Sequence, residues 1–164
     1  MLWAAHQGHQ AAQVLDSVAS LCSPLDLAAG GHAIGSGLNR YIYTPYFLRT
    51  MIPKALAKWQ QYPGLFDQVA LRQVRDLYQF DQIFTAPLHG FSSTEDYWQR
   101  ASAKPHLRDI KIPAKLINAR NDPFIPTHSW PTPGDISSSC QLIQTPSGGH
   151  VGYKNEELIQ LLTT

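Results

Sequence analysis

Two short loops of the sequence each carry a side chain suited to proton transfer. Asp122 lies in ARNDPFIP and His150, 28 positions later, lies in SGGHVGY, and each loop follows a strand-like apolar run. A carboxylate that accepts a hydrogen bond from one imidazole nitrogen fixes the tautomer and leaves the other nitrogen free to take a proton from a nucleophile. The two residues therefore have the chemistry of two thirds of a catalytic triad.

Each of these residues also has a simpler explanation. An aspartate before proline is a common turn former, and a histidine among glycines is often structural. Their joint order is more informative, because a strand followed by an acid and a further strand followed by a histidine is the order found in the α/β-hydrolase fold.

The elements that must position these loops are three predicted strands. They are VLDSVASLC (14–22), IPAKLINA (112–119) and CQLIQT (140–145), followed by a helix in NEELIQLL (155–162). Functional side chains of open α/β sheets collect at the carboxyl ends of the strands. Strands that alternate with loops and helices in this way predict a mostly parallel sheet.

The region between the first two strands contains no clear strand. Residues 28–37 (AAGGHAIGSG) are predicted to be a loop, and residues 39–59 to form short helices interrupted at Pro45 and Pro53. Further helices are predicted at 67–78 and at 93–103, where Ser92 or Ser93 can cap the start. Another precedes the first strand at 1–9. We therefore expect one partial α/β domain over 1–164, with 28–105 a mainly helical, cap-like insertion.

Several linked motifs resemble the C-terminal portion of the YheT-type branch of the α/β-hydrolase superfamily. These are LCSPLDL (21–27), PLHGFSSTEDYW (87–98), KIPAKLINARNDPF (111–124) and GGHVGY (148–153), in the order and at the spacing of that family. The similarity extends over nearly the whole chain up to Tyr153. It implies a serine hydrolase that acts on carboxylic esters, with Asp122 as the triad acid and His150 as the general base.

The serine expected from this resemblance is missing. The family carries it in a G-x-S-x-G turn before the LCSPLDL strand, and these 164 residues contain no such motif. Oxyanion-hole amides would also come from upstream sequence. We therefore expect this chain alone to be inactive as an ester hydrolase. The alternative is a non-catalytic binding or interaction module derived from the same fold.

Other residues that could carry chemistry have weaker patterns around them. Ser36 has glycines at both adjacent positions but not two positions away on each side, and Cys22 is more consistent with a core thiol than with a nucleophile. His6 and His9 lack the acidic or thiol ligands that a metal site needs. His89 either lines a pocket or fixes a turn. Tyr41, Tyr43, Tyr46, Phe47 and Trp59 are interpreted as the inner side of the cap rather than as a separate binding site.

The composition excludes several function classes. A formal net charge of +1, with scattered basic residues, gives no support for a nucleic-acid partner. The chain has no basic leader and no apolar stretch long enough to span a bilayer, so we expect a cytoplasmic protein. Cys22 and Cys140 each lie in or beside an apolar, strand-like segment, so we expect buried, reduced thiols. No cofactor is expected, and the partner is a small acyl ester. An exposed apolar edge of the sheet would favour self-association.

Overall fold

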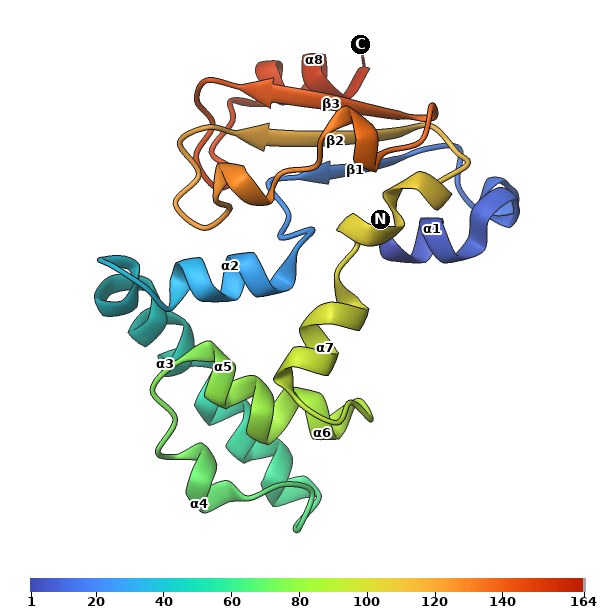
Figure 1. Ribbon diagram of the computed structural model, residues 1–164. Helices are drawn as coiled ribbons and strands as arrows, with labels where there is room; N and C mark the ends of the chain where they lie inside the picture. The colour runs from blue at the N-terminus through green and yellow to red at the C-terminus, as the bar shows by residue number, and fades with distance from the viewer. Residues whose placement is uncertain (164) are drawn as a thin grey trace. The chain divides into compact units, whose positions relative to one another are not determined.

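The computed structural model describes residues 1–163, which divide into two compact units. The first comprises residues 1–29 together with those from 101 onward, and the second comprises residues 30–100. All three strands belong to the first unit, and the described part of the second is helical. The elements of each unit can be followed in Figure 1.

The first unit is built on a three-stranded parallel sheet in the order β1-β2-β3. The strands are β1 (Val18–Leu21), β2 (Ala114–Ala119) and β3 (Cys140–Thr145). Val18 pairs with Ala114, and Ala114 pairs in turn with Cys140. The central strand β2 is nearly all buried, as expected for a parallel strand covered on both faces. The α/β fold class and the two later strands are therefore as predicted.

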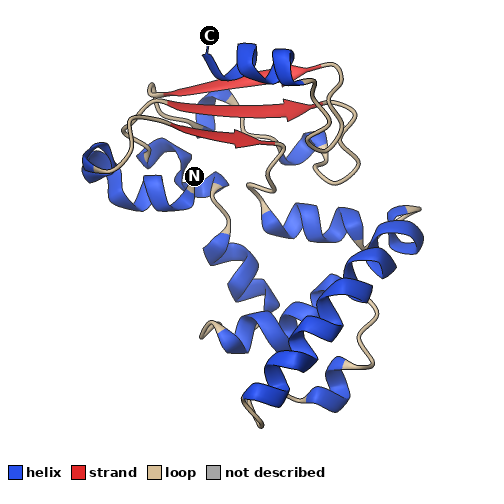
Figure 2. Ribbon diagram, turned by 180° about the vertical axis from the view of Figure 1, so that it is seen from behind, coloured by secondary structure: helices blue, strands red, loops and turns tan. Residues whose placement is uncertain are grey.

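One face of the sheet packs on the N-terminal helices. Leu116 of β2 and Leu142 of β3 contact a core to which α1 (Leu2–Gln7) contributes Ala4 and Ala5 and η3 (Lys104–Asp109) contributes Leu107. On the opposite face, α8 (Asn155–Thr163) lies over Lys115, whose ammonium group donates to the carbonyl oxygens of Leu161 and Leu162. Figure 2 shows the sheet of this unit from behind.

The first strand is shorter than its apolar run predicts. Residues 8–13 form a 3-10 helix, η1 (Gly8–Gln13), and the strand starts only at Val18. Ala11 is fully buried in the core that also holds Ala4, so packing of this turn outweighs the strand preference of the residues that follow. Val14 and Leu15 are exposed instead of paired.

The prediction of a loop over 28–37 is wrong, because α2 (Leu27–Ile34) is a helix. The Asp26 carboxylate accepts a hydrogen bond from the Ala29 N–H and so caps its start. A Cβ on Gly31 would lie 2.6 Å from the Trp98 ring, so this glycine permits close packing of two helices rather than a turn.

The predicted breaks at Pro45 and Pro53 are also absent. Both prolines lie inside one helix, α3 (Asn39–Gln61). Each leaves a carbonyl group one turn earlier without its helical donor, at Tyr41 and Arg49. Both of these residues are exposed, so water can bond to their carbonyl groups. The inner face of α3 packs in a core with Leu71 and Phe80, which favours the continuous helix.

Short helices follow in the second unit. The predicted helix at 67–78 is two helices, because Asp67 and Asp76 each cap a separate start. The last helix of the unit begins where predicted, with the Ser93 hydroxyl accepting from the Asp96 N–H. The elements are α4 (Gln68–Leu71), α5 (Leu77–Phe80), the π-helix η2 (Asp81–Thr85), α6 (Ala86–Leu88) and α7 (Thr94–Ala101).

Candidate active site at the carboxyl end of the sheet

The acid loop, residues 120–126, follows β2 and is held by its own aspartate. The Asp122 Oδ1 atom accepts hydrogen bonds from the backbone N–H groups of Phe124 (2.8 Å) and Ile125 (3.3 Å). The Asp122 side chain is 1% exposed. A short polar side chain that bonds to the backbone two residues on is a common way to fix a tight turn. This turn therefore holds the carboxylate in one orientation.

The histidine loop, residues 146–153, follows β3 and depends on its glycines. A Cβ at Gly148 would lie 2.4 Å from the Tyr153 ring, so only glycine lets that ring lie against the backbone. Gly149 has φ 54°, a conformation that glycine adopts without steric cost. Val151 has φ 68°, in the same region, where a β-branched residue is strained.

The two loops bring the predicted acid and histidine together. His150 Nδ1 lies 3.0 Å from Asp122 Oδ2, which is a hydrogen bond and, when the imidazole is protonated, an ion pair. The His150 side chain is 38% exposed, and within residues 1–163 nothing bonds to its Nε2 atom. An ionised Asp122 would hold the proton on Nδ1 and leave Nε2 as the free base. The arrangement can accept a proton from a group outside it.

Two further residues of the acid loop contact the histidine loop. The Asn121 Oδ1 atom accepts a hydrogen bond from the Gly149 N–H at 2.8 Å, and the Phe124 ring meets the His150 ring edge-on with centroids 4.7 Å apart. Sequence reasoning gave neither residue a role. Asn121 and Gly149 each lie one position before a residue of the Asp122–His150 pair, and this equal spacing could have indicated their contact. No pattern in the sequence indicates the contact between the Phe124 and His150 rings.

The other side of the histidine loop is tied to β1 and β3. The Tyr153 hydroxyl lies 2.8 Å from Thr145 Oγ1, and the Cys22 thiol, at the end of β1, donates to the Gly149 carbonyl at 3.4 Å. Burial raises the pKa of the Tyr153 phenol; its bond to Thr145 opposes this effect and its contact with Cys22 adds to it. Cys22 is therefore a buried packing residue that touches the site, a role the sequence did not reveal.

Two of the remaining candidates, Ser36 and His89, belong to the second unit. Ser36 is exposed beyond the end of α2, with its hydroxyl donating to the Ala33 carbonyl, and His89 is exposed at the end of α6. No group of three or more potential metal ligands is found within residues 1–163. Both cysteines carry free thiols; Cys22 is buried as predicted, and Cys140 is half-buried.

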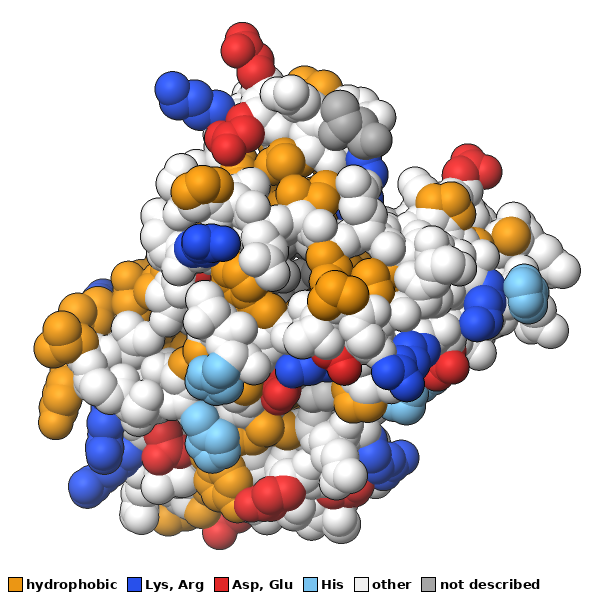
Figure 3. All heavy atoms as spheres, turned by 45° about the horizontal axis from the view of Figure 1, so that its top comes forward, with side chains coloured by type: hydrophobic (Ala, Val, Ile, Leu, Met, Phe, Trp, Pro, Cys, Tyr) orange, Lys and Arg blue, Asp and Glu red, His pale blue; other side chains and the backbone are white. Residues whose placement is uncertain are grey.

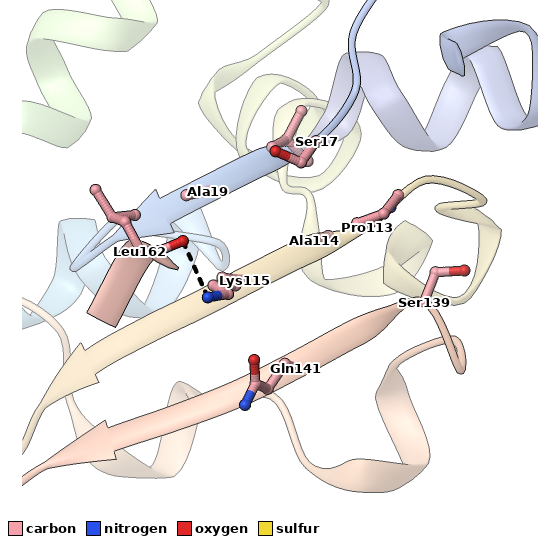
Figure 4. A pocket seen from close by; sticks show the side chains of 9 residues that line it. Ser17, Ala19, Pro113, Ala114, Lys115, Ser139, Gln141 and Leu162 are labelled. Atoms are coloured by element: carbon pink, nitrogen blue, oxygen red, sulfur yellow. Dashed lines mark hydrogen bonds between the residues drawn. The ribbon is translucent and has the colours of Figure 1, made fainter. Parts of the chain in front are cut away.

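A cavity of about 270 Å³ lies at the opposite end of the sheet. It is lined at the amino ends of the strands by residues that include Ser17, Pro113 and Ser139, and Lys115 crosses it to reach Leu162 of α8 (Figure 4). The Lys115 ammonium is thus occupied by helix carbonyls. This cavity is separate from the Asp122–His150 pair.

Charged side chains of both signs are mixed on the surface of the molecule (Figure 3). On the face shown in Figure 3, basic and acidic side chains are interspersed, with hydrophobic side chains between them. None of the helices over residues 1–163 has the length and apolar character needed to cross a bilayer.

Comparison with known proteins gives several relatives. The chain is 31% identical to "Putative esterase YheT" of Escherichia coli over 85% of its own length and 41% of that protein, and 32% identical to "Putative esterase slr0264" of Synechocystis over 93% and 46%. It is 27% identical to the monoacylglycerol lipase of Saccharomyces cerevisiae over 85% and 32%. No protein-family model matches the chain, and no solved structure matches it significantly.

The parallel sheet and these relatives together define the class: the chain is a relative of the α/β-hydrolases. Within that class, the relatives named above are esterase-like and lipase-like proteins. The chain spans between about a third and a half of their length.

Proposed function

We propose that Asp122 and His150 are the acid and the general base of a serine-type carboxylic ester hydrolase. The observation that carries the proposal is the 3.0 Å bond between a side chain that is 1% exposed and an imidazole whose Nε2 is free. The esterase and lipase names of the relatives support the substrate class. Residues 28–105 are proposed to be the helical cap of this enzyme.

The chemistry follows from the geometry of the pair. His150 Nε2 takes the proton of a serine hydroxyl as that oxygen attacks the ester carbonyl, and it then returns the proton to the leaving alcohol. Asp122 stabilises the imidazolium that forms between these steps, while the Asn121 bond to Gly149 holds the loop in place. Water then hydrolyses the acyl-enzyme by the same route.

The nucleophile is proposed to come from polypeptide outside these 164 residues. The sequence contains no G-x-S-x-G motif, and its relatives are longer than the segment they share with it. The outer edge of β1, which has no strand partner within residues 1–163, is the proposed place for further strands. Without them, the pair has a base but no group to activate, and we expect the chain alone to be inactive.

A fluorophosphonate probe, which labels activated serines covalently, tests this proposal. The 164-residue chain is compared with the longest in-frame polypeptide that its gene encodes, each with and without His150→Ala. We expect labelling of the longer protein only, reduced by a factor of about 10⁴ or more in the variant. Labelling of the 164-residue chain would overturn the proposed origin of the serine. No labelling of any form would favour the non-catalytic module.

A further inference from the structure

One residue of the acid loop contacts both members of the proposed acid–base pair. The Phe124 N–H donates to Asp122 Oδ1 at 2.8 Å. The Phe124 ring meets the His150 ring edge-on, with centroids 4.7 Å apart and 76° between the ring planes. The backbone of Phe124 is thus bonded to the acid, and its side chain lies against the base. A phenyl ring cannot transfer a proton, so these contacts suggest a role in holding the pair.

The bond to Asp122 does not by itself fix the plane of the imidazole. A single hydrogen bond at Nδ1 restrains one atom of a flat ring, and hydrogen bonds tolerate a range of angles. The His150 side chain is 38% exposed, so burial restrains the ring only in part. A second contact on the ring is therefore needed to keep Nε2 aimed in one direction.

The backbone of Phe124 is fixed by contacts that do not involve His150. The next residue, Ile125, is 6% exposed, and its N–H also donates to Asp122 Oδ1, at 3.3 Å. The Ile125 carbonyl in turn accepts a hydrogen bond at 3.3 Å from the indole of Trp130, which is buried. The Phe124 ring is therefore attached to a firmly held turn, and it can restrain the more exposed imidazole.

We propose that Phe124 is a positioning residue, whose ring holds the His150 imidazole so that Nε2 stays aimed at the nucleophile. This role rests on the function proposed above. An aromatic side chain suits it, because two rings attract each other in a preferred edge-to-face geometry, which an aliphatic chain lacks. Precise aim matters, since a misplacement of about 1 Å can cost an enzyme roughly a hundredfold in rate.

Proton NMR of the 164-residue chain tests the ring contact in solution and requires no catalysis. The ring current of Phe124 shifts the signals of the His150 ring protons, which are assigned by their loss in His150→Ala. We expect Phe124→Leu to move these signals and Phe124→Tyr to leave them nearly in place. Unchanged signals in Phe124→Leu would overturn the positioning role, whether or not the proposed function holds.

The rate of fluorophosphonate labelling of the longest in-frame polypeptide tests the effect on the base. Phe124→Leu should lower this rate by roughly tenfold, and Phe124→Tyr should stay within about twofold of the parent. The control is Phe66→Leu, which removes a similar edge-on contact, with Phe84 at 5.0 Å and 81°, from the core of the second unit. It should lower the free energy of unfolding but leave the labelling rate unchanged. Phe124→Met, which also lacks the ring, replaces Phe124→Leu if circular dichroism shows that the latter does not fold.

The labelling results separate the positioning role from its alternatives. Equal loss in Phe66→Leu would mean that the rate follows overall stability. A loss in Phe124→Leu that differs between probes with short and long alkyl chains would indicate a direct contact with the substrate instead. An unchanged rate in Phe124→Leu would overturn the positioning role and leave the proposed function standing. Absence of labelling in the parent polypeptide would overturn both.

Discussion

The acid loop and the histidine loop end neighbouring strands but are stabilised in different ways. In the acid loop, the Asp122 carboxylate bonds to the backbone of its own turn and is nearly inaccessible to solvent. In the histidine loop, the backbone has positive φ at Gly149 and Val151, and its contacts come from distant residues such as Cys22. One loop is stabilised locally and the other by long-range contacts.

This difference matches what each side chain would have to do. A group that only orients and stabilises an imidazole gains from burial and from a fixed rotamer, as Asp122 has. A proton acceptor must reach the reacting atoms, and His150 keeps part of its ring accessible. The histidine loop therefore requires support from β1 and β3, since its own residues supply little.

The largest expected effect concerns the local stabilisation of the acid loop. Asp122→Ala removes the acceptor of two backbone N–H groups and of His150, and should lower the free energy of unfolding by about 3 kcal/mol. Asp122→Asn keeps an acceptor for the turn and should cost about 1 kcal/mol. Urea unfolding followed by far-UV circular dichroism measures both. Equal losses would mean that the turn does not depend on this side chain.

A smaller effect is expected from the histidine loop's glycines. Gly148→Ala places a methyl group against the Tyr153 ring and should cost about 2 kcal/mol. Gly149→Ala is the matched control: its φ is also positive, but a Cβ there meets nothing within 4 Å, so only the backbone cost of about 1 kcal/mol remains. The same unfolding measurement should rank the two; the reverse ranking would show that the ring contact is unimportant.

Tyr153→Phe tests the long-range support. Loss of the hydroxyl leaves buried Thr145 without that partner and should cost about 1 kcal/mol at neutral pH. Burial raises the pKa of Tyr153 above 10.0. The contribution of the phenol to the free energy of unfolding is therefore complete below pH 10.0, and it is lost as the pH rises through the raised pKa of the folded state. The free energies of unfolding of the parent chain and of Tyr153→Phe, measured in urea, should therefore converge at high pH. A constant difference would contradict this.

The smallest effect has the opposite sign. Val151→Gly relieves a β-branched residue at positive φ and should stabilise the chain by about 0.5 kcal/mol after the entropy cost of glycine. Val14→Gly, at an exposed valine with φ −120°, should destabilise it by about as much. Thermal unfolding should show a raised Tm for Val151→Gly and a lowered Tm for Val14→Gly. Destabilisation by Val151→Gly would show that the loop stores no strain there.

Much of the sheet could be predicted because its strands are encoded locally. Buried apolar runs flanked by loops gave β2 and β3, and parallel order put Asp122 and His150 at one edge. The glycines of α2 were misleading, since the helix depends on a tryptophan 67 positions beyond Gly31. The prolines of α3 were misleading too, because core packing outweighs their effect on a partly exposed helix.

The contacts around the site were less accessible to sequence reasoning. The bond from Cys22 to Gly149 joins residues 127 positions apart, and its existence depends on the order of strands and on side-chain rotamers. Phe124 gives no local sign that its ring will meet an imidazole rather than the core. Residue type and spacing can indicate which groups meet at a sheet edge, but not which neighbours hold them there.

The register of β2 and β3 also limits where these loops can change length during evolution. Ala119 lies opposite Thr145, and the Arg120 N–H donates to the Thr145 carbonyl. The tie between Asn121 and Gly149 lies two and four positions beyond the Ala119–Thr145 pair. A residue inserted on either side between the strand end and that tie would move one partner without the other. Insertions after the acid loop, in the connection to β3, leave both partners in place. We therefore expect homologous sequences to differ in length mainly there.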